Sequence, residues 1–172
     1  MARLPCIEEK DLPEHAQLIA DIRAQRGGRL SHLYATLLNS PAVAAGWLHF
    51  LTAVRQHTKL AGNYRELVIL QVAVLNGAHY EYKSHVPHAV KEGITQRQID
   101  DLPDWRKSTV FDERMRAVLA YGEAMTRDIE VPDKVFDAVH AFLDDQETME
   151  LTSVIAAYNL VSRFLVALKV GS

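Results

Sequence analysis

Residues 67–75 form a continuous apolar segment broken only by Gln71, and this segment constrains the fold more than any other part of the chain. The lack of alternation favours a helix that is buried on all sides over an amphipathic surface helix. Glu66 stands directly before the segment, and Asn76-Gly77 follows it as a pair that breaks a helix. The sequence therefore predicts a buried central helix that begins with a carboxylate.

The other long segments of the sequence are also typical of helices. A second helix is predicted from about His79 to Glu92, with Gly93 as its C-terminal cap and Pro87 inside it. No alternating strand pattern competes with the helical spacing. Further helix starts are predicted at Asp11-Leu12-Pro13-Glu14, Ser31, Ser40-Pro41, Asn63, Thr95, residue 112, Val131-Pro132-Asp133, and Asp144 or Asp145. We expect an all-α fold and a single domain over residues 1–172, with its core motif at 63–93.

The overall composition restricts the partners and the compartment. The net charge of −3 argues against nucleic acid as the main partner, because phosphate binding needs a basic surface. No apolar run reaches the roughly 20 residues that span a bilayer, and residues 1–15 carry charges where a signal peptide has an apolar core. We expect a cytoplasmic protein without a membrane partner. Cys6 is the only cysteine, so a redox mechanism that needs two thiols in one chain is excluded.

A group of titratable side chains follows the apolar segment. Glu81 and His85 are four residues apart and share one helical face, and His88 lies three residues further on. A carboxylate that faces an imidazole in a half-buried site can hold and pass a proton near neutral pH. If the two predicted helices form an antiparallel hairpin, Glu66 lies at roughly the same level along the hairpin as His85. Glu66, Glu81 and His85 are therefore the candidate catalytic residues.

Each candidate has a structural alternative. Glu66 can close a cap begun by Asn63 and interact with the helix dipole. Glu81 and His85 can form an exposed ion pair that contributes only about 0.3–0.5 kcal/mol. His79 and His88 can be surface or packing histidines. A metal site of Glu81, His85 and His88 would lack a specific zinc signature and an evident fourth ligand, so no metal is assigned.

The same residues resemble the carboxymuconolactone decarboxylase family, which includes the AhpD-like alkylhydroperoxidases. The AhpD pattern is a glutamate, an apolar helix, Cys-x-x-Cys-x-x-x-His, and then a small residue and a glycine at four-residue steps. Corresponding positions hold Glu66, Ala78-His79-Tyr80-Glu81, His85, Ala89 and Gly93. The decarboxylase-like branch is similar at Asn39-Ser40-Pro41…Gly46-Trp47, Tyr80-Glu81-Tyr82…His85 and Ala156-Ala157-Tyr158-Asn159…Arg163-Phe164. The resemblance spans most of the chain and implies an AhpD-like helical bundle.

The chain departs from the AhpD pattern at both thiol positions, which hold Ala78 and Glu81. A carboxylate cannot carry out two-electron thiol chemistry, so a peroxidase activity is disfavoured. The resemblance still implies that Glu66 and His85 handle a proton, and in this chain Glu81 is an additional titratable group beside them. The resemblance also implies a homo-oligomer (dimer, trimer or hexamer) and chemistry without a cofactor.

The leading hypothesis is a decarboxylase-like lyase, an acid/base enzyme that acts on a small carboxylated substrate of the lactone type. Tyr80 and Arg163 are the candidate substrate-binding residues. The guanidinium of Arg163, or alternatively that of Arg65 next to Glu66, can bind a substrate carboxylate. Packing or an interface contact is the alternative for Tyr80, and surface solvation or an ion pair is the alternative for Arg163. Two other hypotheses stay open: peroxide reduction by Cys6 in an oligomer, and a non-catalytic binding protein on the same fold.

Overall fold

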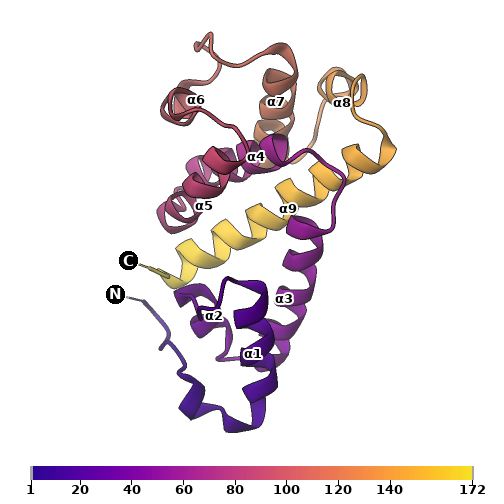
Figure 1. Ribbon diagram of the computed structural model, residues 1–172. Helices are drawn as coiled ribbons and strands as arrows, with labels where there is room; N and C mark the ends of the chain where they lie inside the picture. Colours follow the sequence, from indigo (N-terminus) through magenta and orange to yellow (C-terminus); the bar gives the residue numbers. More distant parts are fainter. Residues whose placement is uncertain (1, 172) are drawn as a thin grey trace. The chain divides into compact units, whose positions relative to one another are not determined.

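The structure is a computed structural model that describes residues 2–171, and every regular element within them is helical (Figure 1). The all-α prediction is therefore confirmed. The α-helices are α1 (Ala16–Gln25), α2 (His32–Leu37), α3 (Pro41–Gln56), α4 (Gly62–Leu75), α5 (His79–Lys91), α6 (Gln96–Asp101), α7 (Glu113–Arg127), α8 (Asp133–His140) and α9 (Asp145–Leu168), with 3-10 turns at Glu9–Asp11, Pro13–His15 and Leu102–Asp104.

Backbone contacts divide the described chain into two compact units. The smaller unit comprises residues 2–57 and 165–171, and therefore α1, α2, α3 and the end of α9. The larger unit comprises residues 58–164, with α4 to α8 and most of α9. The single domain over residues 1–172 stays a prediction.

The apolar segment of the sequence is the central helix of the larger unit. α4 packs against both α5 and α7, and every residue from 66 to 73 is buried. Burying one large aliphatic side chain contributes about 1.5–3 kcal/mol, so this helix supplies much of the stability of the unit. The core that it shares with its neighbours contains Leu67, Leu70, Ala89, Ile94, Ile99, Leu102, Trp105, Phe111 and Leu119.

Polar side-chain caps fix several helix starts where the sequence predicts them. Ser31 accepts a hydrogen bond from the backbone N–H of Tyr34, and Thr95 forms a capping box with Gln98. The prediction for α4 is wrong, because this helix begins at Gly62 with Ala61 as its N-cap. The oxygen of Asn63 instead accepts from the neighbouring Tyr64 N–H. Glu66 is thus one turn inside the helix and takes no part in a cap.

By length and composition, α9 is the one described helix that could cross a bilayer. Its most apolar 18-residue window has a mean hydropathy of 1.6. On these criteria the expectation that no segment reaches membrane length does not hold for α9. Half of that window is buried within the protein, as in the core helix of a soluble protein, so the property is weak evidence for a membrane span.

The close contact of α7 with α4 at Gly122 gives a stability prediction. A Cβ atom at Gly122 would lie 2.5 Å from Oε1 of the buried Gln71, whose Nε2 is held by the Leu119 carbonyl. We expect Gly122→Ala to lower the free energy of unfolding by about 1–3 kcal/mol through overpacking, despite a gain in helix propensity of about 1 kcal/mol. Urea unfolding measures the change.

Gln71→Ala provides the matched background for this test. It removes the atom that the new methyl group meets, so Gly122→Ala in that background is expected to be neutral or stabilising. Equal destabilisation in both backgrounds would contradict the proposed contact.

Candidate active site

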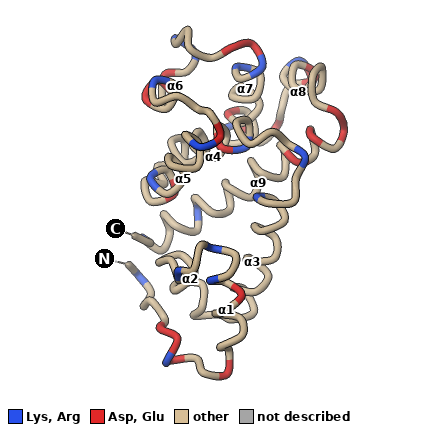
Figure 2. The backbone as a smooth tube through the Cα atoms, viewed as in Figure 1, with Lys and Arg blue, Asp and Glu red and all other residues tan. Residues whose placement is uncertain are grey.

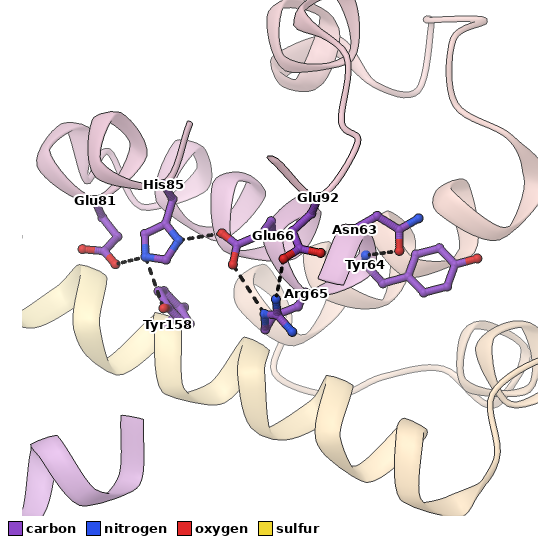
Figure 3. A network of polar contacts seen from close by, with 8 residues as sticks. All are labelled: Asn63, Tyr64, Arg65, Glu66, Glu81, His85, Glu92 and Tyr158. Carbon is purple, nitrogen blue, oxygen red and sulfur yellow. Dashed lines mark hydrogen bonds and ion pairs between the residues drawn. The ribbon is translucent and has the colours of Figure 1, made fainter. Parts of the chain in front are cut away.

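Three helices of the larger unit converge on the imidazole of His85 (Figure 3). α5 carries His85 together with Glu81, α4 contributes Glu66, and α9 contributes Tyr158. Glu66 and His85 are each 3% exposed and Glu81 is 5% exposed. The exposed ion pair that was the alternative for Glu81 and His85 is therefore excluded.

The two ring nitrogens of His85 have different surroundings. Nδ1 lies 2.7 Å from Oε2 of Glu66, a distance typical of a charge-assisted hydrogen bond. Nε2 lies 3.1 Å from Oε1 of Glu81 and 3.2 Å from the hydroxyl of Tyr158. In the protonated imidazole both ring N–H groups donate, one to each carboxylate. Glu66 thus fixes one side of the ring, and two groups compete for the other.

The neighbouring carboxylates favour the charged form of the imidazole. Burial by itself lowers the pKa of His85, because a charged ring loses its hydration. Hydrogen bonds to Glu66 and Glu81 and the negative charge of both residues outweigh burial, and the net effect raises the pKa of His85 above 6.5. The ring therefore holds a proton at a higher pH than an ordinary histidine does.

The chain of charges continues beyond Glu66 toward solvent. Nε of Arg65 lies 3.4 Å from Oε1 of Glu66, and a second guanidinium nitrogen lies 3.4 Å from Oε1 of Glu92. The Arg65 side chain is 14% exposed and that of Glu92 is 38% exposed. Negative and positive groups thus alternate from Glu81 through His85, Glu66 and Arg65 to Glu92 (Figure 3).

The structure places the other sequence candidates around this centre. Tyr80 is half-buried in α5, directly before Glu81. Arg163 is exposed on α9, five residues after Tyr158 and so on a different face of that helix. The substrate roles of both residues stay predictions.

Two further histidines of α5 lie near the site in sequence. His79 is exposed in the first turn of the helix. His88 is also exposed, and its ring centroid lies 5.5 Å from that of His85. Within residues 2–171, no three or more His, Cys, Asp or Glu side chains are grouped to hold a metal ion.

Tyr158 is the site residue that the spacing of the sequence did not reveal. It is 1% exposed, and its ring meets the ring of His85 edge-on at a centroid distance of 5.1 Å. Seventy-three positions separate the two residues in the chain. A tyrosine in an apolar helical stripe is indistinguishable from core packing, and only the resemblance at 156–159 pointed to this segment.

Comparisons with known proteins show which family and which sequences this chain resembles. The pattern of the carboxymuconolactone decarboxylase family matches residues 41–124, which include Glu66, Glu81 and His85. The Bacillus subtilis (strain 168) protein YdfG, itself uncharacterized, is 26% identical over 106 residues, covering 60% of this chain and 72% of that protein.

Two solved structures have the same fold. An Agrobacterium tumefaciens protein of unknown function, described as a putative antioxidant defence protein AhpD, is 26% identical with a TM-score of 0.73, over 77% of this chain and 92% of that one. A peroxidase-related protein from Ralstonia eutropha JMP134, described as an alkylhydroperoxidase AhpD core, is 18% identical with a TM-score of 0.83, over 98% and 90%. The second likeness shows the fold alone.

The contacts of His85 predict how its titration responds to substitution. Glu66→Gln and Glu81→Gln each remove a negative charge beside the ring, so each is expected to lower the pKa of His85. Arg65→Gln removes a positive charge and is expected to raise it. NMR titration of the His85 ring protons measures all three shifts. Glu123→Gln, which changes a carboxylate that pairs with Arg106 and Arg127, is the control and should leave His85 unchanged.

The raised pKa also predicts how stability depends on pH. The contribution of protonated His85 to the free energy of unfolding is fully present below the unfolded-state pKa of about 6.5. This contribution is lost as the pH rises through the higher folded-state pKa. We therefore expect the wild type to lose unfolding free energy across this range. His85→Gln should lack this part of the loss, as urea unfolding at successive pH values would show. Parallel profiles for the two proteins would contradict the assignment.

Proposed function

We propose that this chain, whose residues 41–124 match the carboxymuconolactone decarboxylase family and whose fold is AhpD-like, is a cofactor-independent acid/base enzyme acting on a small carboxylated lactone. The observation that carries the proposal is the buried His85 ring, held on one side by Glu66 and approached on the other by Glu81 and Tyr158. A raised pKa keeps a transferable proton on this ring near neutral pH.

Decarboxylation of such a substrate needs one proton and no electron transfer. The bond between carbon and the departing carboxylate breaks, and its electron pair passes into the conjugated lactone carbonyl to form an enolate. The proton on Nε2 of His85 then moves to the substrate carbon, directly or through Glu81 or Tyr158. The imidazole becomes neutral, and a proton from solvent restores it. Carbon dioxide leaves, and the product carries hydrogen in place of the carboxylate.

Glu66 has the positioning role in this scheme. Its short bond to Nδ1 fixes the tautomer, so the transferable proton is always the one on Nε2. The carboxylate also stabilises the charged ring, as the aspartate does for the histidine of a Ser-His-Asp triad. Arg65 lies on the far side of Glu66 and pairs with its other carboxylate oxygen.

Substrate binding would use groups around the Nε2 side of the ring. We assign Tyr80, next to Glu81 on α5, to a contact with the substrate. Arg163 stays a candidate for binding a substrate carboxylate through the two parallel hydrogen bonds of its planar guanidinium, but it is exposed on a different face of α9 from Tyr158.

The AhpD-like neighbour from Agrobacterium tumefaciens favours peroxide reduction as the second candidate function. In this chain Cys6 is the only cysteine, and it is exposed. The thiol positions of the AhpD pattern hold Ala78 and Glu81, neither of which can be oxidised and re-reduced by thiols. Acid/base chemistry therefore needs only the carboxylates and the imidazole that the site contains. Peroxide reduction would need thiols at the positions of Ala78 and Glu81.

Turnover of carboxylated lactones tests the proposal. The protein is incubated with carboxymuconolactone and related lactone acids, and carbon dioxide release is measured. His85→Ala is expected to reduce kcat by roughly 10²–10⁴-fold, the usual contribution of a general acid. Glu81→Gln should reduce kcat in the same direction and shift its pH profile. His79→Ala, an exposed histidine on the same helix, is the matched control.

Each part of the proposal can fail separately. A wild type that turns over no carboxylated lactone would contradict the substrate class. Turnover that survives both His85→Ala and Glu81→Gln would contradict the site.

Peroxide consumption separates the two candidate functions. The wild type and Cys6→Ser are incubated with hydrogen peroxide and with an organic hydroperoxide in the presence of a dithiol reductant. We expect equal and negligible consumption, since neither thiol position of the AhpD pattern holds a cysteine in this chain. Consumption that disappears in Cys6→Ser would instead favour the peroxidase function.

A further inference from the structure

The end of α5 places a carboxylate against the first residue of α4. A Cβ atom added at Gly62 would lie 1.9 Å from Oε2 and 2.3 Å from Cδ of Glu92, so the Glu92 side chain lies directly against the Gly62 backbone. Only glycine leaves this space open. Figure 2 shows acidic and basic residues close together where α4 lies beside α5. Glu92 is therefore packed against a neighbouring helix, although its side chain is 38% exposed.

The position of Glu92 is unfavourable for its own helix and favourable for the next one. Glu92 is the C-cap of α5, and a negative charge at a helix C-terminus is repelled by the partial charge of the last carbonyl groups. Its carboxylate lies at Gly62, the first residue of α4, where the N–H groups of the helix start favour an anion. The contact across the α4–α5 hairpin therefore accounts for an acidic residue at this end of α5.

Arg65 needs an anchor outside its own helix to reach Glu66. The two residues are adjacent in α4, and adjacent residues of a helix do not face each other. Even so, Nε of Arg65 lies 3.4 Å from Oε1 of Glu66, while a second guanidinium nitrogen lies 3.4 Å from Oε1 of Glu92 (Figure 3). Gly62 is four residues before Glu66 and shares its helical face. A carboxylate beside Gly62 therefore draws the guanidinium toward Glu66.

We propose that Glu92, packed against Gly62, is a positioning residue of the His85 site. It holds Arg65 beside Glu66, and Glu66 in turn binds Nδ1 of the ring. The absence of a side chain at Gly62 is part of this arrangement, because any Cβ there would displace the Glu92 carboxylate. The inference concerns how the site is held together and does not depend on which substrate the site takes.

The substitutions that test this role leave every group that faces the ring in place. Glu92 stands seven residues after His85, so it lies roughly 10 Å further along the direction of α5 and acts only through other residues. The groups that face the ring from the three helices around it are Glu66 of α4, Glu81 and His88 of α5, and Tyr158 of α9. A change in the titration of His85 after substitution at Gly62 or Glu92 therefore reports an indirect effect.

An ordinary ion pair between Arg65 and Glu92 would act on His85 in the opposite direction. As a charge alone, Glu92 favours the protonated ring, so its removal would lower the pKa of His85. As a positioning residue, Glu92 keeps a cation beside Glu66. Its removal then lets Arg65 turn toward solvent, leaves the negative charge of Glu66 uncompensated beside the ring, and raises the pKa of His85. The sign of the shift distinguishes the two roles.

NMR titration of the His85 ring protons tests the inference. Glu92→Ala removes the anchor, and Gly62→Ala displaces it without altering any charge. Both variants are expected to raise the pKa of His85, in the same direction as Arg65→Gln. Gly62→Ala in the Glu92→Ala background has no side chain to displace and should add no further shift. Exchange of the Arg65 Nε–H proton with solvent, followed in the same samples, should become faster in both single variants.

Gly46→Ala is the matched control. A Cβ atom added at this helical glycine of α3 meets nothing within 4 Å, so the variant should keep the wild-type titration of His85. Circular dichroism checks that each variant stays folded. An unchanged pKa in both folded single variants would overturn the inference, and so would a lower pKa in Glu92→Ala or an equal shift in Gly46→Ala. Because the readout is a titration and not turnover, the inference can fail while the proposed lactone chemistry holds, and the reverse.

Discussion

The hydrogen bond between Glu66 and His85 is the interaction on which the rest of the site depends. Two charged groups buried this deeply are unfavourable unless they are paired and fully hydrogen-bonded. Here the imidazole lies between two carboxylates, and the outer oxygen of Glu66 is met by Arg65. Removing one member leaves the next charge uncompensated, which typically costs about 3–5 kcal/mol for a buried pair. The group therefore ties α4, α5 and α9 together as well as holding a proton.

The residues at the two thiol positions decide what this scaffold can do. A cysteine beside the histidine would provide a nucleophile whose proton the imidazole removes. Glu81 stands at the second thiol position, with its carboxylate 3.1 Å from the ring. Ala78 stands at the first thiol position, three residues earlier, and is buried. A carboxylate exchanges protons with the imidazole but forms no disulfide. The residues at these two positions therefore support the proposed acid/base chemistry rather than thiol redox chemistry.

Local rules of the sequence predict the elements of this protein better than they predict its site. Side-chain caps at Ser31, Thr95 and Asp112 mark helix starts because the hydrogen bonds involved span only three residues. Glu81 and His85 could be paired from their four-residue spacing alone. The pairing of Glu66 with His85 required a hairpin between two helices, and the resemblance supported it. Asn63 misled the cap assignment because its side chain satisfies a neighbouring N–H instead. Tyr158 could not be found from spacing, since its contact with His85 depends on how α9 packs against α5.

The hydrogen bonds on the two sides of the imidazole differ, and this difference favours the proposed proton transfer over a purely structural role. A purely structural histidine gains most when each ring N–H has one well-aligned acceptor. The Nδ1 side meets that condition at 2.7 Å. On the Nε2 side two oxygens lie within 0.1 Å of the same distance, at 3.1 and 3.2 Å, and a single N–H cannot point fully at both. Neither bond is as short as a charge-assisted bond usually is, at about 2.7–2.9 Å. The proton on this side therefore has two alternative acceptors at similar distances. A nitrogen fixed by Glu66, opposite one with two alternative acceptors, supports the proton transfer proposed for His85.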